Sequence, residues 1–129
     1  MAQVKIFGLK TQLEPIRKEL SDAIHSAVVE ALAYPREKRF HRFIGLSQDD
    51  FLYPPDRSNR YLILEISLFE GRSVKAKKSL IRALYRYIGD ATGITPNDIE
   101  ITLFETPRHN WGIRGVPGDE LNLNYKVSV

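Results

Sequence analysis

Residues 60–69 read RYLILEISLF, and the alternation in this stretch decides how the rest of the chain is interpreted. Every second position holds a large aliphatic side chain: Leu62, Leu64, Ile66 and Leu68. The positions between them include Glu65 and Ser67. Because successive side chains of a β-strand point to opposite faces of the sheet, this pattern predicts a strand with one face in the core.

The residues after this strand predict a helix and then a second strand. Ser73 is a favourable N-cap residue, and Gly93 is suited to end the helix in the left-handed conformation. Between them, apolar residues recur at helical spacing: Ala76, Leu80, Leu84, Ile88 and Ala91. The segment DIEITLFE, residues 98–105, then predicts the next strand.

The first half of the chain shows the same order of elements. Residues 3–8, QVKIFG, and residues 40–46, FHRFIGL, predict two strands. The helix between them begins with Thr11 and Glu14, which have the spacing of a capping box, and Pro35 follows its end.

The two halves align at an offset of about 60 residues, which pairs Ile6 with Ile66 and Leu20 with Leu80. Each half is a βαβ unit with a right-handed crossover between parallel strands. The duplication therefore predicts an α+β fold, in which a four-stranded mixed sheet carries two helices on one face.

We expect one domain over residues 1–129, with half-repeats at 1–58 and 59–107 and a C-terminal arm at 108–129. The sheet face opposite the helices has no cover, so we expect it to contact other subunits. Three large apolar residues are expected to point there: Phe7, Phe43 and Ile63.

The composition excludes several classes of protein. The chain has no cysteine, which excludes disulfides, thiolate catalysis and cysteine-ligated metal centres. No apolar run approaches the roughly 20 residues of a membrane span, and no signal-peptide core is present, so we expect a soluble, cytoplasmic protein without a membrane partner.

The net charge is a mild +3. One basic stripe has helical spacing, but without an aromatic platform it favours a solvated face over nucleic-acid binding: Lys75, Lys78, Arg82 and Arg86.

Most signatures of catalytic chemistry are absent. The sequence has no GxGxxG, P-loop, GxSxG or HExxH motif, and its histidines lack metal-ligand spacing, so we expect neither a metal nor a cofactor. His25 and His41 are expected to be structural, whereas the role of His109 in its loop stays open. Glu65 and Glu105 could pair as acid and base, although such residues more often meet solvent or a cation.

Arg72 is the most informative charged residue. It follows Gly71 at the end of the predicted strand and precedes the helix capped by Ser73. A guanidinium beside the free N–H groups of a helix start is suited to bind a carboxylate. The alternative is an ion pair with a nearby Asp or Glu, and the sequence favours neither.

Together these features resemble the tautomerase superfamily, especially its larger members near malonate semialdehyde decarboxylase. The resemblance runs nearly end to end. Besides the duplicated order of elements it rests on four short segments: IHSAVVEAL before Pro35, GRS at 71–73, TGITPNDIEI at 92–101 and NWGIRG at 110–115. It implies a homotrimer whose sheets line a barrel-like centre, with active sites at subunit boundaries and C-terminal hairpins that reach across to neighbours.

The resemblance also assigns a role to the only tryptophan of the chain, Trp111. In related enzymes the corresponding residue forms part of the active-site wall, which implies that Trp111 and Ile113 exclude water from the site. Gly112, Gly115 and Gly118 would let this stretch turn tightly. A role of Trp111 as a staple of the trimer stays open.

The chain departs from the family at the residue on which its catalysis centres. The family uses an N-terminal proline whose amine has a lowered pKa, and alignment of the first helix places Ala2 there, so the proline is missing. Removal of Met1 would leave a primary amine, which is a less well positioned base. Lys38 stands where the decarboxylase has an aspartate. The decarboxylase also has two arginines: Glu70 replaces one of them in this chain, and Arg72 matches the other.

Two main hypotheses follow. The first is a tautomerase-like protein, an isomerase if it is active, that binds a small 2-oxo or enol carboxylate through Arg72; decarboxylation is less favoured. Its proton would be carried by Ala2, Lys38 or His109. Further substrate contacts are expected from six residues: Arg39, Arg42, His109, Trp111, Ile113 and Arg114. The second hypothesis is a non-catalytic trimer that binds a small molecule or a protein; nucleic-acid binding ranks last.

Overall fold

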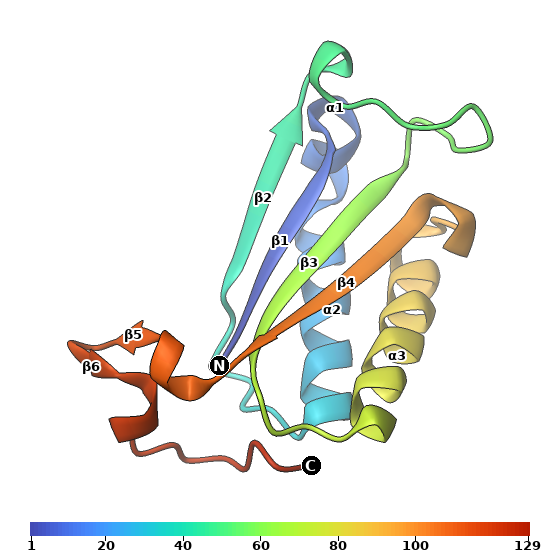
Figure 1. The fold of residues 1–129 in the computed structure, drawn as a ribbon. Coiled ribbons are helices and arrows are strands. Elements are labelled where there is room, and N and C mark those ends of the chain that lie inside the picture. Colours follow the sequence, from blue (N-terminus) through green and yellow to red (C-terminus); the bar gives the residue numbers. More distant parts are fainter.

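The computed structural model describes residues 1–129 and contains a four-stranded sheet, two long helices and a C-terminal arm (Figure 1). The sheet has the order β2-β1-β3-β4, in which β1–β2 and β3–β4 are parallel and the central pair β1–β3 is antiparallel. The predicted α+β fold with a mixed sheet is therefore confirmed. The strands are β1 (Ala2–Leu9), β2 (His41–Leu46), β3 (Leu62–Phe69) and β4 (Ile99–Thr106).

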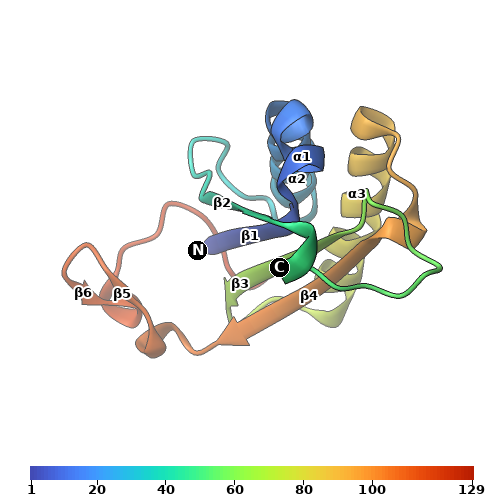
Figure 2. The ribbon, with the colours of Figure 1, turned by 90° about the horizontal axis from the view of Figure 1, so that it is seen from above.

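The two long helices lie side by side on one face of the sheet, as Figure 2 shows from above. They are α2 (Arg17–Leu32) and α3 (Val74–Thr92). The predicted ends of α3 are confirmed: Ser73 Oγ accepts a hydrogen bond from Ala76 N at 3.1 Å, and Gly93 ends the helix with φ 75°. None of the helices combines the length and the apolar composition that a membrane span requires.

The main core lies between the sheet and these helices. The alternation of residues 60–69 is confirmed, because its four aliphatic residues are each at most 1% exposed: Leu62, Leu64, Ile66 and Leu68. The apolar stripe of α3 is confirmed up to Ile88, but Ala91 is exposed. Ile94, just past the end of the helix, is buried in the core instead.

The first helical segment begins differently from the prediction. α1 (Lys10–Leu13) follows β1 directly, with Leu9 as an N-cap that supplies no side-chain hydrogen bond. The capping box of Thr11 and Glu14 is therefore wrong, because the chain enters the helix one residue before Thr11 and leaves no room for a cap there. The 3-10 turn η1 (Glu14–Ile16) then separates α1 from α2.

The sheet face opposite the helices also differs from the prediction, at one residue. The register pairs Ile6 with Phe43 and Phe7 with Ile44, and Ile6 is fully buried under the helices. Phe43 therefore packs on the helix side, against the prediction, and Ile44 lies on the open face in its place. Phe7 and Ile63 lie on the open face as expected, half-buried against a small second apolar cluster.

A short hairpin projects from the body after β4 (Figures 1 and 2). It consists of β5 (Gly112–Ile113) and β6 (Val116–Pro117). Arg114 and Gly115 form its two-residue turn, both with positive φ, at 50° and 85°. The predicted C-terminal hairpin is thus confirmed.

Four further 3-10 turns lie outside the first helix: η2 (Gln48–Asp50), η3 (Pro96–Asp98), η4 (Arg108–Asn110) and η5 (Gly118–Glu120). At the base of the arm, Gly118 N donates to Trp111 O at 2.8 Å. A β-carbon on Gly118 would clash with Arg108 O, so this turn requires glycine, whereas Gly112 meets no such restriction.

Leu64 allows a test of the core. Leu64→Ala is expected to lower the free energy of unfolding by about 2–5 kcal/mol, because it leaves a cavity between the sheet and the helices. The same change at Leu52, which is 87% exposed, is expected to cost less than about 0.5 kcal/mol. Urea unfolding of both variants provides the measurement, and equal losses would contradict the placement of Leu64.

Candidate active site

The start of β1 lies against two tyrosines from distant parts of the chain. The Met1 amine lies 2.5 Å from Tyr125 Oη, and Ala2 N donates to Tyr34 Oη at 3.2 Å. The rings of Tyr34 and Tyr125 meet edge to face, with centroids 5.0 Å apart. Met1 and Ala2 are each only 4% exposed, so the amine is held inside the protein rather than in solvent.

The electrostatic environment of this amine favours its neutral form. Burial lowers the pKa of the Met1 amine from 8.0 to about 4, and the positive charges of Arg72, Lys38 and Arg108 add to the effect. The amine is therefore unprotonated at neutral pH. It has a free lone pair that can accept a proton, as a general base must.

Arg72 is a buried cation with two unused donors. It is 5% exposed and lies in the turn between β3 and α3, after Gly71 with φ 128°. Its Nη1 donates to Phe69 O at 3.2 Å, whereas Nε and Nη2 are buried without a partner. No carboxylate forms an ion pair with it, and burial lowers its pKa. The nearest candidate on β4, Glu105, binds Lys77 at 2.7 Å instead.

Lys38 belongs to the same group of charges. It is half-buried in the segment between α2 and β2, and its Nζ lies 5.1 Å from the centre of the Tyr125 ring. It forms no ion pair with an acidic side chain. The structure therefore brings together three residues expected to act jointly: Ala2, Lys38 and Arg72.

The region around the Met1 amine, Arg72 and Lys38 is called the corner below. Three of its members were not anticipated from the sequence: Tyr34, Tyr125 and Arg108. Arg108 lies in η4, donates from Nη2 to Gly118 O at 3.2 Å and to Leu121 O at 3.3 Å, and keeps a buried Nε without a partner. A surface pocket of about 400 Å³ opens between Arg108 and Tyr125. Only Arg108 had a signal in the sequence, since it immediately precedes the loop of His109 and Trp111.

Within one copy of the chain, the arm residues expected in the site make their contacts with residues other than the amine. Trp111 Nε1 donates to Thr106 Oγ1 at 2.7 Å, and its ring meets that of Phe69 edge to face at 5.0 Å. The indole is thus fixed at the base of the arm. Ile113 is half-buried in the hairpin, while His109 and Arg114 are exposed.

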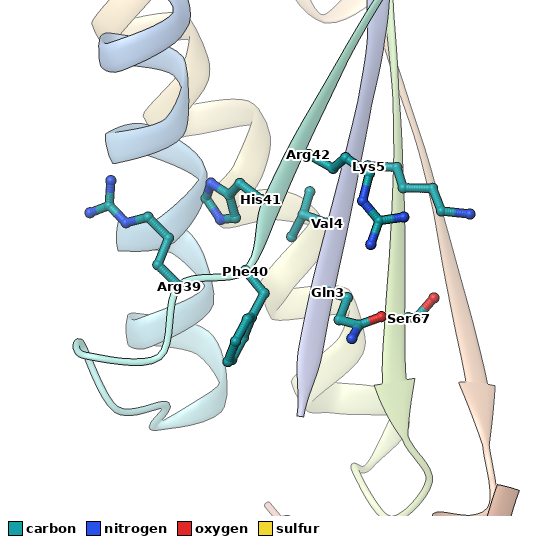
Figure 3. Close-up of a pocket in the computed structure, with 8 residues that line it drawn as sticks. All are labelled: Gln3, Val4, Lys5, Arg39, Phe40, His41, Arg42 and Ser67. Atoms are coloured by element: carbon teal, nitrogen blue, oxygen red, sulfur yellow. The ribbon is translucent and has the colours of Figure 1, made fainter. Parts of the chain in front are cut away.

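Arg39 and Arg42 line a different pocket, of about 270 Å³, beside the start of β2 (Figure 3). Arg39 forms an ion pair with Asp22 at 2.6 Å. Arg42 is exposed and lies opposite Lys5 in the β1–β2 register. Within one chain, these two arginines therefore do not join Arg72.

The two remaining histidines make contacts that link α2 to its surroundings. His25 Nε2 lies 2.7 Å from Arg36 O, and His41 Nδ1 lies 2.7 Å from Ser21 Oγ. Burial, and then the neighbouring His25, lower the pKa of His41 to about 4. These contacts hold α2 against the start of β2 and the segment that precedes it.

Comparison with protein families gives one match over more than half of the chain. The model of a family described as tautomerase enzyme matches residues 38–114. The 2-hydroxymuconate tautomerase of Comamonas testosteroni is 35% identical over 57 residues, which cover 44% of this chain and 90% of that protein. The probable tautomerase YusQ of Bacillus subtilis (strain 168) is 23% identical over 99 residues, covering 73% and 78%.

Solved structures share the fold. A malonate semialdehyde decarboxylase, described with decarboxylase and hydratase activities, has a TM-score of 0.81 at 22% identity, covering 92% of this chain and 99% of that one. A fused 4-OT described as a symmetric trimer has a TM-score of 0.76 at 18% identity, covering 91% and 96%. At these identities the likeness shows the fold, and it confirms the tautomerase-like architecture expected from the sequence.

The lowered pKa of the amine can be tested by acylation with acetic anhydride, which attacks only unprotonated amines. An ordinary terminal amine has a pKa near 8, so its acylation rate falls about tenfold for each pH unit below that value. Here the amine loses its proton above a pKa of about 4, so the rate should stay constant from pH 8 to pH 5. Mass spectrometry of the terminal peptide measures the rate. A steady decline below pH 8 would contradict the buried amine.

Proposed function

Because the chain belongs to the tautomerase enzyme family, we propose that it moves a proton between oxygen and carbon of a small 2-oxo or enol carboxylic acid. One observation carries the proposal: an unprotonated terminal amine lies in the same corner as a buried arginine with two unused donors. The amine is the proton carrier, and Arg72 holds the carboxylate of the substrate.

The free donors of Arg72 suit a carboxylate. Nε and Nη2 form one edge of the planar guanidinium, and two parallel N–H groups match the two oxygens of a carboxylate. Both donors are buried, so a bound carboxylate would satisfy groups that water does not reach. A buried charge without a counterion is costly, and a substrate anion removes that cost.

The proposed step is an isomerisation that needs no second reactant. The amine takes the proton of the enol hydroxyl, the oxygen forms the carbonyl, and the electron pair of the C=C bond takes a proton at carbon. The negative charge that develops on oxygen is stabilised by Lys38 and Arg108, the other cations around the amine. The amine is restored when its proton passes to carbon.

Which residue carries the reactive amine depends on whether Met1 is removed from the chain. With Met1 in place, the amine lies at Tyr125; without it, the amine of Ala2 starts at the position that now donates to Tyr34. We propose Ala2 as the carrier in the processed chain. Intact mass distinguishes the two forms, and the faster form in the assay below identifies the carrier.

We further propose that the remaining site residues come from neighbouring copies in a homotrimer. Fused 4-OT relatives are described as trimers, and the open sheet face and projecting arm offer surfaces for such contacts. Six residues would then reach the corner of another copy: Arg39, Arg42, His109, Trp111, Ile113 and Arg114. Light scattering of the purified protein tests the trimer directly.

The assay for the proposed function is the ketonisation of phenylenolpyruvate, followed by ultraviolet absorbance. Arg72→Ala is expected to lower kcat/KM about hundredfold, because it removes two charge-assisted hydrogen bonds to the carboxylate. Arg72→Lys keeps the charge without the planar edge and should recover only part of the loss.

Arg82→Ala is the matched control, since Arg82 is an exposed arginine of α3 and should leave the rate unchanged. Equal rates for the native protein and Arg72→Ala would overturn the role of Arg72. The absence of native turnover, combined with thermal stabilisation by millimolar phenylpyruvate, would favour the alternative of a non-catalytic binding protein.

A further inference from the structure

Residues 121–129, the C-terminal strap, return from the arm to the corner that holds the amine. Leu121 O accepts a hydrogen bond from Arg108, and Val129 O accepts one from Ser73 N at 2.9 Å. Val127 covers Gly71, where a β-carbon would come within 3.1 Å of Val127 Cγ1. A side-chain hydrogen bond at one end and a backbone hydrogen bond at the other thus fix the strap, and Figure 1 shows it passing close to the start of β1.

Tyr125 is the residue of the strap that packs on the main core. Its ring is held on two sides, by the edge-to-face contact with Tyr34 and by Lys38 Nζ. The ring cannot turn freely between these neighbours, and its hydroxyl points at the Met1 amine. The Tyr34 hydroxyl instead accepts the hydrogen bond of Ala2 N, one residue along the chain from the Met1 amine.

Building on the function proposed above, we infer that Tyr125 is a positioning residue for the reaction in the chain that retains Met1: its hydroxyl orients the Met1 amine and stabilises the proton that this amine takes up, while its ring keeps water away. When the amine is neutral, one of its N–H groups donates to the phenol oxygen, which leaves the lone pair free for the substrate proton. When the amine has taken a proton, the ammonium donates to the phenol oxygen. The same contact therefore serves both states of the carrier.

The two parts of Tyr125 act on the amine in opposite directions. The hydroxyl stabilises the charged ammonium by accepting its hydrogen bond, whereas the ring disfavours it by excluding water. Other groups that face the amine are Arg72 from the β3–α3 turn, Lys38 from the segment after α2, Arg108 from η4 and the neutral Tyr34. On β4, Glu105 acts on Arg72 only from a distance and is bound to Lys77.

Two substitutions at Tyr125 separate these effects. Tyr125→Phe keeps the ring and deletes the hydroxyl, so the acid midpoint of amine acylation should stay at or below pH 4 while ketonisation of phenylenolpyruvate falls about tenfold in kcat. KM should change little, because Arg72 still holds the carboxylate. Tyr125→Ala admits water, so the acylation midpoint should move up toward 8.

Tyr87→Phe is the matched control. The Tyr87 hydroxyl donates to Glu30 on the outer side of the helix pair, away from the amine, and its removal should change neither acylation nor turnover. Thermal unfolding at pH 7 verifies that each variant is folded. The strap lies outside the sheet and the long helices, and Tyr125→Phe preserves the packing of the ring in any case.

The acylation midpoint and the ketonisation rate test separate parts of the inference. A midpoint near 4 in Tyr125→Ala, or a native rate in Tyr125→Phe, would overturn the inference. If the native protein shows no ketonisation, the proposed function fails and the catalytic part of the inference falls with it. The acylation midpoints still decide whether Tyr125 controls the amine, since they need no turnover.

Discussion

The antiparallel pairing of β1 with β3 is the constraint from which the candidate site follows. It places Ala2 opposite Leu68, so the start of the chain lies beside the end of β3. Arg72 comes just after that end, in the turn that leads into α3. Had the central strands been parallel, the amine and the guanidinium would lie at opposite ends of the sheet. The candidate site therefore depends on how two βαβ units join, and not on a local motif.

Local patterns were sufficient to predict the fold, because alternation and helical spacing are properties of neighbouring residues. They failed where the outcome depended on a register or a connection. Phe43 and Ile44 are both apolar, and only pairing with β1 decides which one lies under the helices. Arg72 stood out through its neighbours in sequence. Tyr34 and Tyr125 did not, since they meet the amine only after the chain has closed on itself.

The corner also shows how a protein can concentrate positive charge without compensating it internally. Three cations surround the amine, and none of them forms an ion pair with an acidic side chain; Glu105 on β4, for example, binds Lys77. Such an arrangement costs stability, since buried charges prefer a partner. It also keeps the amine neutral and leaves the corner attractive to anions. Under the proposed function, an anionic substrate would recover this cost on binding.

The seclusion of the Met1 amine has a practical consequence for recombinant protein. An affinity tag or any residue joined ahead of Met1 turns the amine into an amide, which has no basic lone pair, and the added residues have to fit beside Tyr125. A tagged sample would still display the sheet and helices in circular dichroism. Such a sample could be used to measure folding but not proton transfer. A purification tag should therefore be placed at the C-terminus or be removed without leaving residues behind.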